Sequence, residues 1–219
     1  MNLLIIGAPG AGKGTVSESL INDYAITHIS TGDMLRNAIK NNTPVGLKAK
    51  EYMDKGHLVP DEIIHNLIVE RLSQDDVSKG FLFDGYPRTL NQAIDLSKIL
   101  QELNIKIDCV INLDIKDEEL IKRITGRRLC PKCGEIYNIY YSPSKSEGIC
   151  DKCNSELITR KDDNLESLVT RLQEYHKNTQ PLIEYYQKMD LVKHICASKS
   201  IEDVYSDVTT ILEGLKWSV

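Results

Sequence analysis

Short apolar runs alternate with stretches of helical length along most of the chain. Most of the runs stop at a glycine or a polar residue, which is typical of a buried parallel strand. The runs cover residues 2–6, 27–29, 81–83, 107–113 and 191–195. The helical patterns cover residues 13–23, 61–72, 90–103, 117–124, 164–187 and 200–212. This alternation predicts an α/β fold in which helices cover both faces of a five-stranded parallel sheet.

One segment, residues 126–163, interrupts this alternation and has no helical period. It carries two Cys-x-x-Cys pairs separated by sixteen residues: Cys130, Cys133, Cys150 and Cys153. That spacing is typical of a tetrahedral zinc site with four thiolate ligands, which leaves no open position for catalysis. A segment of this size has too little apolar mass for its own core, so a metal would hold it together. An iron centre, or disulfides in an oxidising setting, remain open alternatives.

The composition limits the partners of the protein. Hydrophobic residues make up 41% of the 219 residues, which is enough for a folded core. Lys plus Arg number 27 and Asp plus Glu number 32, so the net charge is −5. A mildly acidic protein is not a general nucleic-acid binder, because that affinity rests on basic surface. An anionic ligand must therefore meet a local cluster of positive charge.

The apolar runs are also too short for a membrane span or an export signal. The run at residues 3–6 falls far below the roughly 20 residues that a spanning helix needs. No Lys or Arg precedes it. The sequence therefore predicts a cytoplasmic protein without membrane contact. The two cysteines outside the cluster, Cys109 and Cys196, are expected to be buried small hydrophobes on or beside strands.

A glycine-rich segment at residues 7–15 separates the first strand from the first helix, and it reads Gly-Ala-Pro-Gly-Ala-Gly-Lys-Gly-Thr. Glycines let successive N–H groups turn onto one anion, and the helix N-terminus adds partial positive charge. Lys13 can reach the terminal phosphates of a nucleotide. The strict pattern has Ser or Thr directly after the lysine, whereas here Gly14 takes that place and Thr15 follows. The order of strand, loop and helix still predicts a P-loop.

Charged residues farther along the chain favour phosphoryl transfer. Asp84 follows a predicted strand, where a carboxylate can hold Mg²⁺ or its waters. Arg88 lies just beyond, where open α/β sheets bind ligands. Arg123 and Arg127 are four residues apart and are expected on one helix face. Phosphoryl transfer depends on positioning and on neutralising phosphate charge, which is work for forked guanidinium groups.

Six motifs are distributed over the whole chain. They are residues 7–15, 30–36 (Ser-Thr-Gly-Asp-Met-Leu-Arg), 56–61 (Gly-His-Leu-Val-Pro-Asp), 83–88 (Phe-Asp-Gly-Tyr-Pro-Arg), 126–128 (Gly-Arg-Arg) and 160–164 (Arg-Lys-Asp-Asp-Asn). Together they resemble the adenylate kinase family, in its bacterial form with a long, zinc-bearing lid. The resemblance implies a reversible, Mg²⁺-dependent transfer of a phosphoryl group from ATP to AMP that gives two ADP. It also implies a monomer that binds neither nucleic acid nor membrane.

The resemblance assigns roles to residues at matching positions. The ATP site matches Gly10, Ala11, Gly12, Lys13, Gly14, Thr15, Arg127, Ile136, Tyr137 and Lys199. The AMP site matches Thr31, Arg36, His57, Leu58, Val59, Gly85, Tyr86, Pro87, Arg88, Gln92, Arg160 and Arg171. The catalytic positions match Lys13, Arg36, Asp84, Arg88, Arg123, Arg160 and Arg171, and structural Zn²⁺ falls to Cys130, Cys133, Cys150 and Cys153. Gln92 would read adenine, because an amide donates and accepts at once.

The resemblance also implies that the chain is divided into a core, a flap and a lid. A P-loop, three-layer core would comprise residues 1–29, 60–125 and 164–219. Residues 30–59 would form a helical AMP-binding flap and residues 126–163 the lid, with hinges at Gly126 and residues 162–163. Asn138 departs from the family, which usually has His there, and the difference concerns base contacts in the lid rather than phosphate chemistry.

Three other functions compete with this interpretation. The nearest is another nucleoside monophosphate kinase, acting on UMP or CMP, which Gln92 and the long lid disfavour. A zinc-ribbon nucleic-acid-binding protein with an ATPase core is disfavoured by the acidic net charge. A P-loop regulator without catalysis is disfavoured by the arginine set.

Overall fold

The computed structural model describes residues 1–215 and contains a five-stranded sheet in which all neighbouring strands are parallel. Its strands are β1 (Asn2–Gly7), β2 (Thr27–Ser30), β3 (Phe81–Asp84), β4 (Cys109–Asp114) and β7 (Val192–Cys196). Their spatial order is β2-β3-β1-β4-β7, so β1 lies in the centre. The predicted α/β fold with a five-stranded parallel sheet is confirmed, and every strand begins and ends within two residues of its predicted limits.

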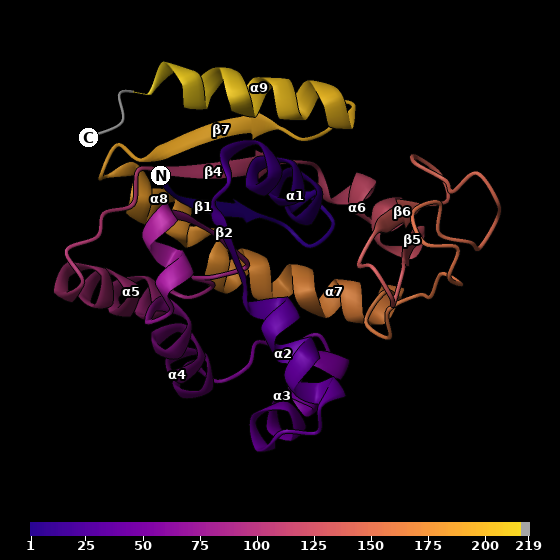
Figure 1. Cartoon of the computed structure of the whole chain (residues 1–219), viewed down its shortest axis with the longest axis horizontal. Helices are drawn as coiled ribbons and strands as arrows, with labels where there is room; N and C mark the ends of the chain where they lie inside the picture. The colour runs from indigo at the N-terminus through magenta and orange to yellow at the C-terminus, as the bar shows by residue number, and fades with distance from the viewer. Residues whose placement is uncertain (216–219) are drawn as a thin grey trace.

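Helices cover both faces of the sheet (Figure 1). One face is covered by α1 (Lys13–Tyr24) and α9 (Ile201–Gly214), and the other by α4 (Asp61–Leu72), α5 (Leu90–Glu102) and α8 (Pro181–Gln187). The side chains of a strand alternate between faces. Leu3 and Ile5 of β1 therefore pack with α1 and α9, whereas Leu4 and Ile6 pack with the other layer. All four are at most 3% exposed, so this short apolar run is the centre of the core.

The helix predicted over residues 164–187 consists of three consecutive elements. They are α7 (Leu165–Glu174), a π-helical turn η2 (Tyr175–Thr179) and α8. Pro181 lacks an N–H group and its ring crowds the preceding turn, so an α-helical ladder cannot continue through it. The Gln180 N–H instead bonds to the Tyr175 carbonyl at 2.8 Å, five residues back, and α8 restarts with the proline in its first turn.

Two smaller parts extend from the core (Figure 1). The flap, residues 30–59, contains α2 (Thr31–Lys40) and α3 (Pro44–Asp54). These helices cross closely because Gly46 has no side chain, and a Cβ there would lie 2.2 Å from the Ala38 carbonyl. The lid, residues 126–163, contains the antiparallel pair β5 (Arg127–Leu129) and β6 (Ile136–Asn138). Helix α7 runs between the flap and the lid, and the 3₁₀ turn η1 (Asp75–Lys79) precedes β3.

For two residues, Arg127 and Cys196, the structure differs from the prediction. Helix α6 (Asp117–Thr125) ends before the lid, so Arg127 lies in β5 and does not share a helix face with Arg123. After Gly126 the chain pairs with β6, and the Arg123 carbonyl, which would accept from the N–H of residue 127 in a continuing helix, accepts from Asn138 Nδ2 at 2.9 Å. Cys109 is fully buried as expected, but Cys196 is exposed, because it ends β7 at the edge of the sheet.

Candidate active site

The glycine-rich segment forms a loop that leads into the first turn of α1. Gly10 and Gly12 have φ values of 87° and 102°, a region that residues with a Cβ rarely adopt. The loop therefore turns its N–H groups and the helix N-terminus toward one space, which suits a phosphate group. Lys13 is the first residue of α1, and its Nζ donates to the carbonyls of Gly7 at 2.7 Å and Ala8 at 3.0 Å.

Burial and neighbouring charges shift the pKa values of two ionisable groups beside this loop, Lys13 and Asp84. Burial, with the repulsion of nearby guanidinium groups, lowers the pKa of Lys13 to about 8, although Asp84 opposes the shift. Burial would raise the pKa of Asp84, but the nearby His28 side chain, with its Nε2 3.6 Å from Oδ2, and the charge of Lys13 outweigh it and hold this pKa below its usual value. Asp84 ends β3 and is ionised at neutral pH. Such a carboxylate is the oxygen ligand that Mg²⁺ prefers.

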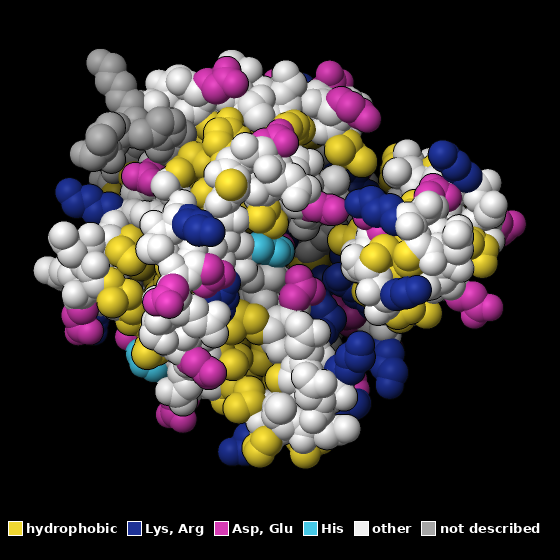
Figure 2. Space-filling model, viewed as in Figure 1, with side chains coloured by type: hydrophobic (Ala, Val, Ile, Leu, Met, Phe, Trp, Pro, Cys, Tyr) yellow, Lys and Arg dark blue, Asp and Glu magenta, His cyan; other side chains and the backbone are white. Residues whose placement is uncertain are grey.

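Five guanidinium groups gather in front of the loop. They come from the flap (Arg36), the segment after β3 (Arg88), the lid (Arg127 and Arg160) and α7 (Arg171). Burial, together with the repulsion between these groups, lowers the pKa of both Arg88 and Arg160 to about 10. Figure 2 shows Lys and Arg side chains along the hollow between lid and flap. Like charges crowded in a poorly hydrated space favour the binding of a polyanion.

Acidic side chains orient three of these arginines. The ion pairs are Arg36 with Asp33 (Nη2–Oδ1 2.6 Å), Arg127 with Asp163 (Nε–Oδ2 2.8 Å) and Arg171 with Asp162 (Nη1–Oδ2 3.0 Å). The Asp163 side chain is fully buried. Each pair fixes the direction of a guanidinium fork and leaves N–H groups for a ligand. Sequence reasoning did not find these carboxylates as arginine partners. The available signals were the three-residue spacing of Asp33 and Arg36 and the acidic pair inside residues 160–164.

A cleft of about 620 Å³, counted to its open mouth, lies between the flap and the core. Its lining includes ten of the residues expected at the AMP site: Thr31, Arg36, His57, Leu58, Val59, Gly85, Tyr86, Arg88, Gln92 and Arg171. The structure therefore brings together residues from three distant segments of the chain.

A second cleft adjoins the P-loop. It is lined by Lys13, by Pro87, which follows a cis peptide bond, and by residues of α7 and η2. It shares Arg88 and Arg171 with the first cleft. Arg160 lines neither of these two clefts, although it lies near enough to Arg36 for the charge of Arg36 to help lower the pKa of Arg160. Two ligands in the two clefts would meet at the shared guanidinium groups.

The residues expected near the ATP base lie in different surroundings. Ile136 reaches over the start of α1, with its Cδ1 3.7 Å from the position that a Cβ on Gly14 would take. Tyr137, the next residue in β6, is buried inside the lid, where its hydroxyl accepts from the Asp151 N–H at 2.8 Å. Lys199 lies before α9 and pairs with Asp207 at 2.6 Å.

Arg123 lies apart from the arginine cluster. Its Nη2 donates to the Ala197 carbonyl at 2.7 Å and its Nη1 to the Ala11 carbonyl at 3.3 Å, so it contacts the P-loop backbone. Its guanidinium carbon lies 5.9 Å from the centre of the Tyr141 ring. Asn138 binds the Arg123 carbonyl and also accepts from the Tyr141 N–H at 3.3 Å. The amide that replaces the family's usual histidine thus joins α6 to the lid.

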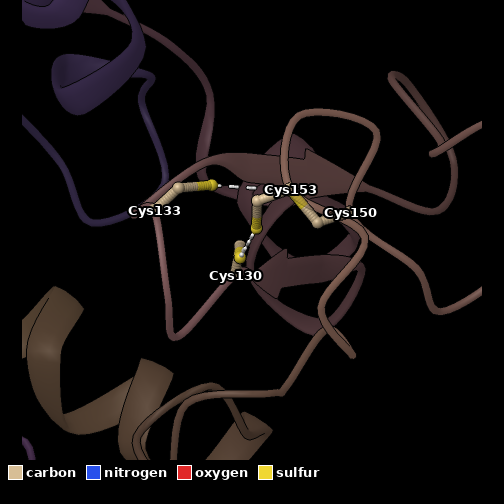
Figure 3. Close-up of side chains that lie close together, drawn as sticks. All are labelled: Cys130, Cys133, Cys150 and Cys153. Carbon is tan, nitrogen blue, oxygen red and sulfur yellow. Dashed lines mark hydrogen bonds between the residues drawn. The ribbon is translucent and has the colours of Figure 1, made fainter.

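The four lid cysteines lie together (Figure 3). All four Sγ atoms are within 4.8 Å of one another, with 3.3 Å between Cys130 and Cys153 and 3.5 Å between Cys133 and Cys150. Zn–S bonds of about 2.3 Å in a tetrahedron separate the sulfurs by roughly 3.8 Å, so the donor set fits zinc. All four thiols are free, and these separations exceed a disulfide bond of about 2.05 Å. Buried Tyr137 packs on this cluster.

Comparison with known proteins gives a consistent result over the chain. A family model described as "Adenylate kinase" matches residues 5–191. The chain is 54% identical to an adenylate kinase of Carboxydothermus hydrogenoformans, over 97% of this chain and 100% of that protein. It is 51% identical to one of Geobacillus sp. (strain WCH70) and 50% identical to one of Archaeoglobus fulgidus, each over 99% of this chain and 100% of that protein. Within residues 1–215, no helix has the length and apolar character needed to cross a membrane.

Proposed function

This chain belongs to the adenylate kinase family and is a phosphotransferase that converts ATP and AMP reversibly into two ADP, and we propose that the reaction takes place in its arginine-lined crevice. The observation that carries the proposal is the pair of clefts that share Arg88 and Arg171. One cleft adjoins the P-loop and the other the flap. Two nucleotides would therefore face each other, phosphate to phosphate, across these two guanidinium groups.

ATP occupies the P-loop side in this proposal. Backbone N–H groups of residues 10–15 and the start of α1 bind its phosphates. Lys13 turns from the carbonyls of Gly7 and Ala8 to phosphate oxygens. The remaining donor-side contacts come from Arg123, Arg127, Ile136, Tyr137 and Lys199.

AMP occupies the flap side, where Thr31, residues 57–59 and Gln92 hold the nucleoside and Arg36 its phosphate. An oxygen of the AMP phosphate forms a bond to the γ-phosphorus of ATP. The bond from that phosphorus to the β–γ bridging oxygen breaks, so ADP leaves on one side and ADP forms on the other. Lys13 and the arginines of the crevice neutralise charge on the moving group, which is the main catalytic work in such a transfer.

Two metal ions accompany this proposal. Mg²⁺, when bound with ATP, neutralises phosphate charge, and the ionised carboxylate of Asp84 is suited to hold the ion or its waters. Zn²⁺ would bind the four thiolates of Cys130, Cys133, Cys150 and Cys153 and would stabilise the lid. Four protein ligands fill a tetrahedral shell, so this ion takes no part in the transfer.

The flap (30–59) and the lid (126–163) close over the core (1–29, 60–125 and 164–219), with Gly126 and residues 162–163 as hinges. Closure excludes water, so the phosphoryl group passes to AMP rather than to solvent. We place the protein in the cytoplasm as a monomer, without nucleic-acid or membrane partners. Its acidic net charge of −5 supports the absence of a nucleic-acid partner.

A coupled assay of ADP production from ATP tests this proposal. We expect ADP to form at least a hundredfold faster with AMP than without it, and faster with AMP than with UMP, CMP or GMP. The Lys13→Ala variant is the negative control for turnover at this site. Preference for UMP or CMP would overturn the choice of acceptor, and ADP production independent of any acceptor would overturn the two-cleft arrangement.

A further inference from the structure

Gln92 is only 5% exposed, and both ends of its side-chain amide are already engaged. Its Oε1 accepts from the Arg88 N–H at 2.7 Å, and its Nε2 donates to Oδ1 of Asp61 at 2.6 Å. A primary amide has two N–H groups and two oxygen lone pairs. One N–H group and one lone pair therefore remain for a ligand in the flap-side cleft, which Gln92 lines.

Asp61 is the first residue of α4, where the chain returns from the flap to the core. Its second oxygen accepts from the Thr89 hydroxyl at 3.3 Å. Thr89 caps α5 and accepts in turn from the Gln92 N–H at 3.1 Å. Asp61, Thr89 and Gln92 thus form a closed circuit of hydrogen bonds that holds the carboxylate against the amide.

This circuit fixes which end of the amide faces which neighbour. An ionised carboxylate only accepts hydrogen bonds, so Asp61 stabilises Nε2 beside it and repels Oε1. If the amide of Gln92 turned by 180°, its oxygen would face the carboxylate and its NH₂ group would face the Arg88 N–H. Both contacts would then be mismatched in a buried place, where unpaired polar groups are costly.

We propose that Asp61 is a positioning residue that makes the acceptor site selective for 6-aminopurines, because it holds the Gln92 amide in one of its two orientations. The inference rests on the proposed role of Gln92 as the adenine contact. In this orientation the free lone pair accepts from the 6-amino group, and the free N–H donates to N1. Hypoxanthine, guanine and uracil present a carbonyl oxygen and an N–H group at the corresponding edge, so they require the reversed amide.

The test is the ratio of kcat/KM for AMP to kcat/KM for inosine monophosphate, which differ in the 6-substituent and the proton on N1. In the Asp61→Leu variant, reversal of Gln92 creates one mismatch, with the Arg88 N–H, instead of two. We expect this ratio to fall at least tenfold, mostly through KM. Asp61→Asn keeps the shape of the side chain, but its own amide can turn and donate to the oxygen of a reversed Gln92, so its ratio should fall as in Asp61→Leu. Glu62→Leu is the matched control, because it removes the neighbouring acidic residue in the first turn of α4.

Three outcomes separate this inference from the function on which it rests. Equal losses for AMP and inosine monophosphate in Asp61→Leu, with the ratio unchanged, would show a purely structural role and overturn the inference. An unchanged ratio in Gln92→Leu would instead overturn the role of Gln92 in the proposed function. If Asp61→Leu does not fold, Asp61→Ala removes the same acceptor with less bulk, and the same tenfold criterion applies to its ratio.

Discussion

Replacement of Gly56 by alanine tests how the flap is seated on the core. Gly56 lies between α3 and α4 with a φ of +79°, and a Cβ there would lie 2.9 Å from the Ser167 carbonyl oxygen and 3.0 Å from Arg171 Cγ. The next residue, His57, contacts Glu174 with 3.1 Å between Nδ1 and Oε1. Ser167, Arg171 and Glu174 follow one face of α7, so this face is the seat of the flap loop.

Two free-energy costs, one conformational and one steric, add up in the Gly56→Ala variant. The left-handed conformation costs a residue with a Cβ about 1–2 kcal/mol. Forcing a methyl group against the helix backbone costs about 1–3 kcal/mol more, as in other overpacked contacts. The total of about 2–5 kcal/mol applies only while the loop lies on α7. Because about 1.4 kcal/mol corresponds to a factor of ten, the seated flap should become at least about tenfold less populated.

We expect initial-rate measurements on Gly56→Ala to give a KM for AMP at least tenfold higher, with the KM for ATP changed less than threefold. Urea denaturation should show a loss of unfolding free energy of at least about 2 kcal/mol. Gly134→Ala is the control, because Gly134 has a φ of +81° and no heavy atom within 4 Å of a Cβ, so it carries the conformational cost alone. Equal destabilisation of the two variants, with an unchanged KM for AMP, would refute the seating of Gly56 on α7.

Three other perturbations address the chemistry of the site. Arg88→Ala and Arg123→Ala should each lower kcat by about 10²–10⁴ in the coupled assay, by analogy with other arginines in phosphoryl transfer, and losses below threefold in both would contradict the arginine assignment. Because burial and neighbouring guanidinium groups lower the pKa of Lys13 from 10.5 to about 8, the free protein loses this charge above about pH 8. The kcat/KM for ATP should then fall as the pH rises, and a flat profile to pH 10 would contradict a need for the charge. As the pH rises, Lys13 loses its proton at a lower pH in the folded state than in the unfolded chain. The contribution of Lys13 to stability therefore rises between about pH 8 and 10.5. Urea titrations can then show that the lost activity is not caused by unfolding. A chelator should lower Tm more than it lowers turnover below that temperature, and atomic emission should detect one zinc ion released per chain. Complete loss of turnover in a folded, metal-free protein would point to a catalytic metal instead.

Much of the fold could be predicted because its signals are local. The apolar run at residues 2–6, the glycines after it and Lys13 are consecutive, so strand, loop and helix follow from their order. The cysteine spacing predicts a four-thiolate cluster in the same way, and the four Sγ atoms do lie together. Helix α4 begins and ends where the pattern over residues 61–72 predicts.

The differences arise where distant segments decide local structure. The pattern over residues 117–124 predicts the end of α6 to within one residue, but it does not show that Asn138, thirteen residues beyond the helix, binds the Arg123 carbonyl. The exposure of Cys196 depends on β7 being an edge strand, and strand order is not visible in a single run of residues. The partners of the arginines and of Gln92 likewise come from other parts of the chain, and their contacts exist only once the flap, the lid and the core have come together.

The lid begins and ends at one place on the core. Leu129 near its start exchanges backbone hydrogen bonds with Ile158 near its end, and Arg127 is paired with Asp163 at the same junction. The two chain crossings of the lid are therefore held to each other as well as to the core. A segment without cysteines could replace the metal-binding part of the lid, provided that it kept Ile136 over the start of α1 and Asn138 on the Arg123 carbonyl. Substitutions in the metal-binding part of the lid can thus change its thermal stability while the P-loop and the strands of the core stay the same.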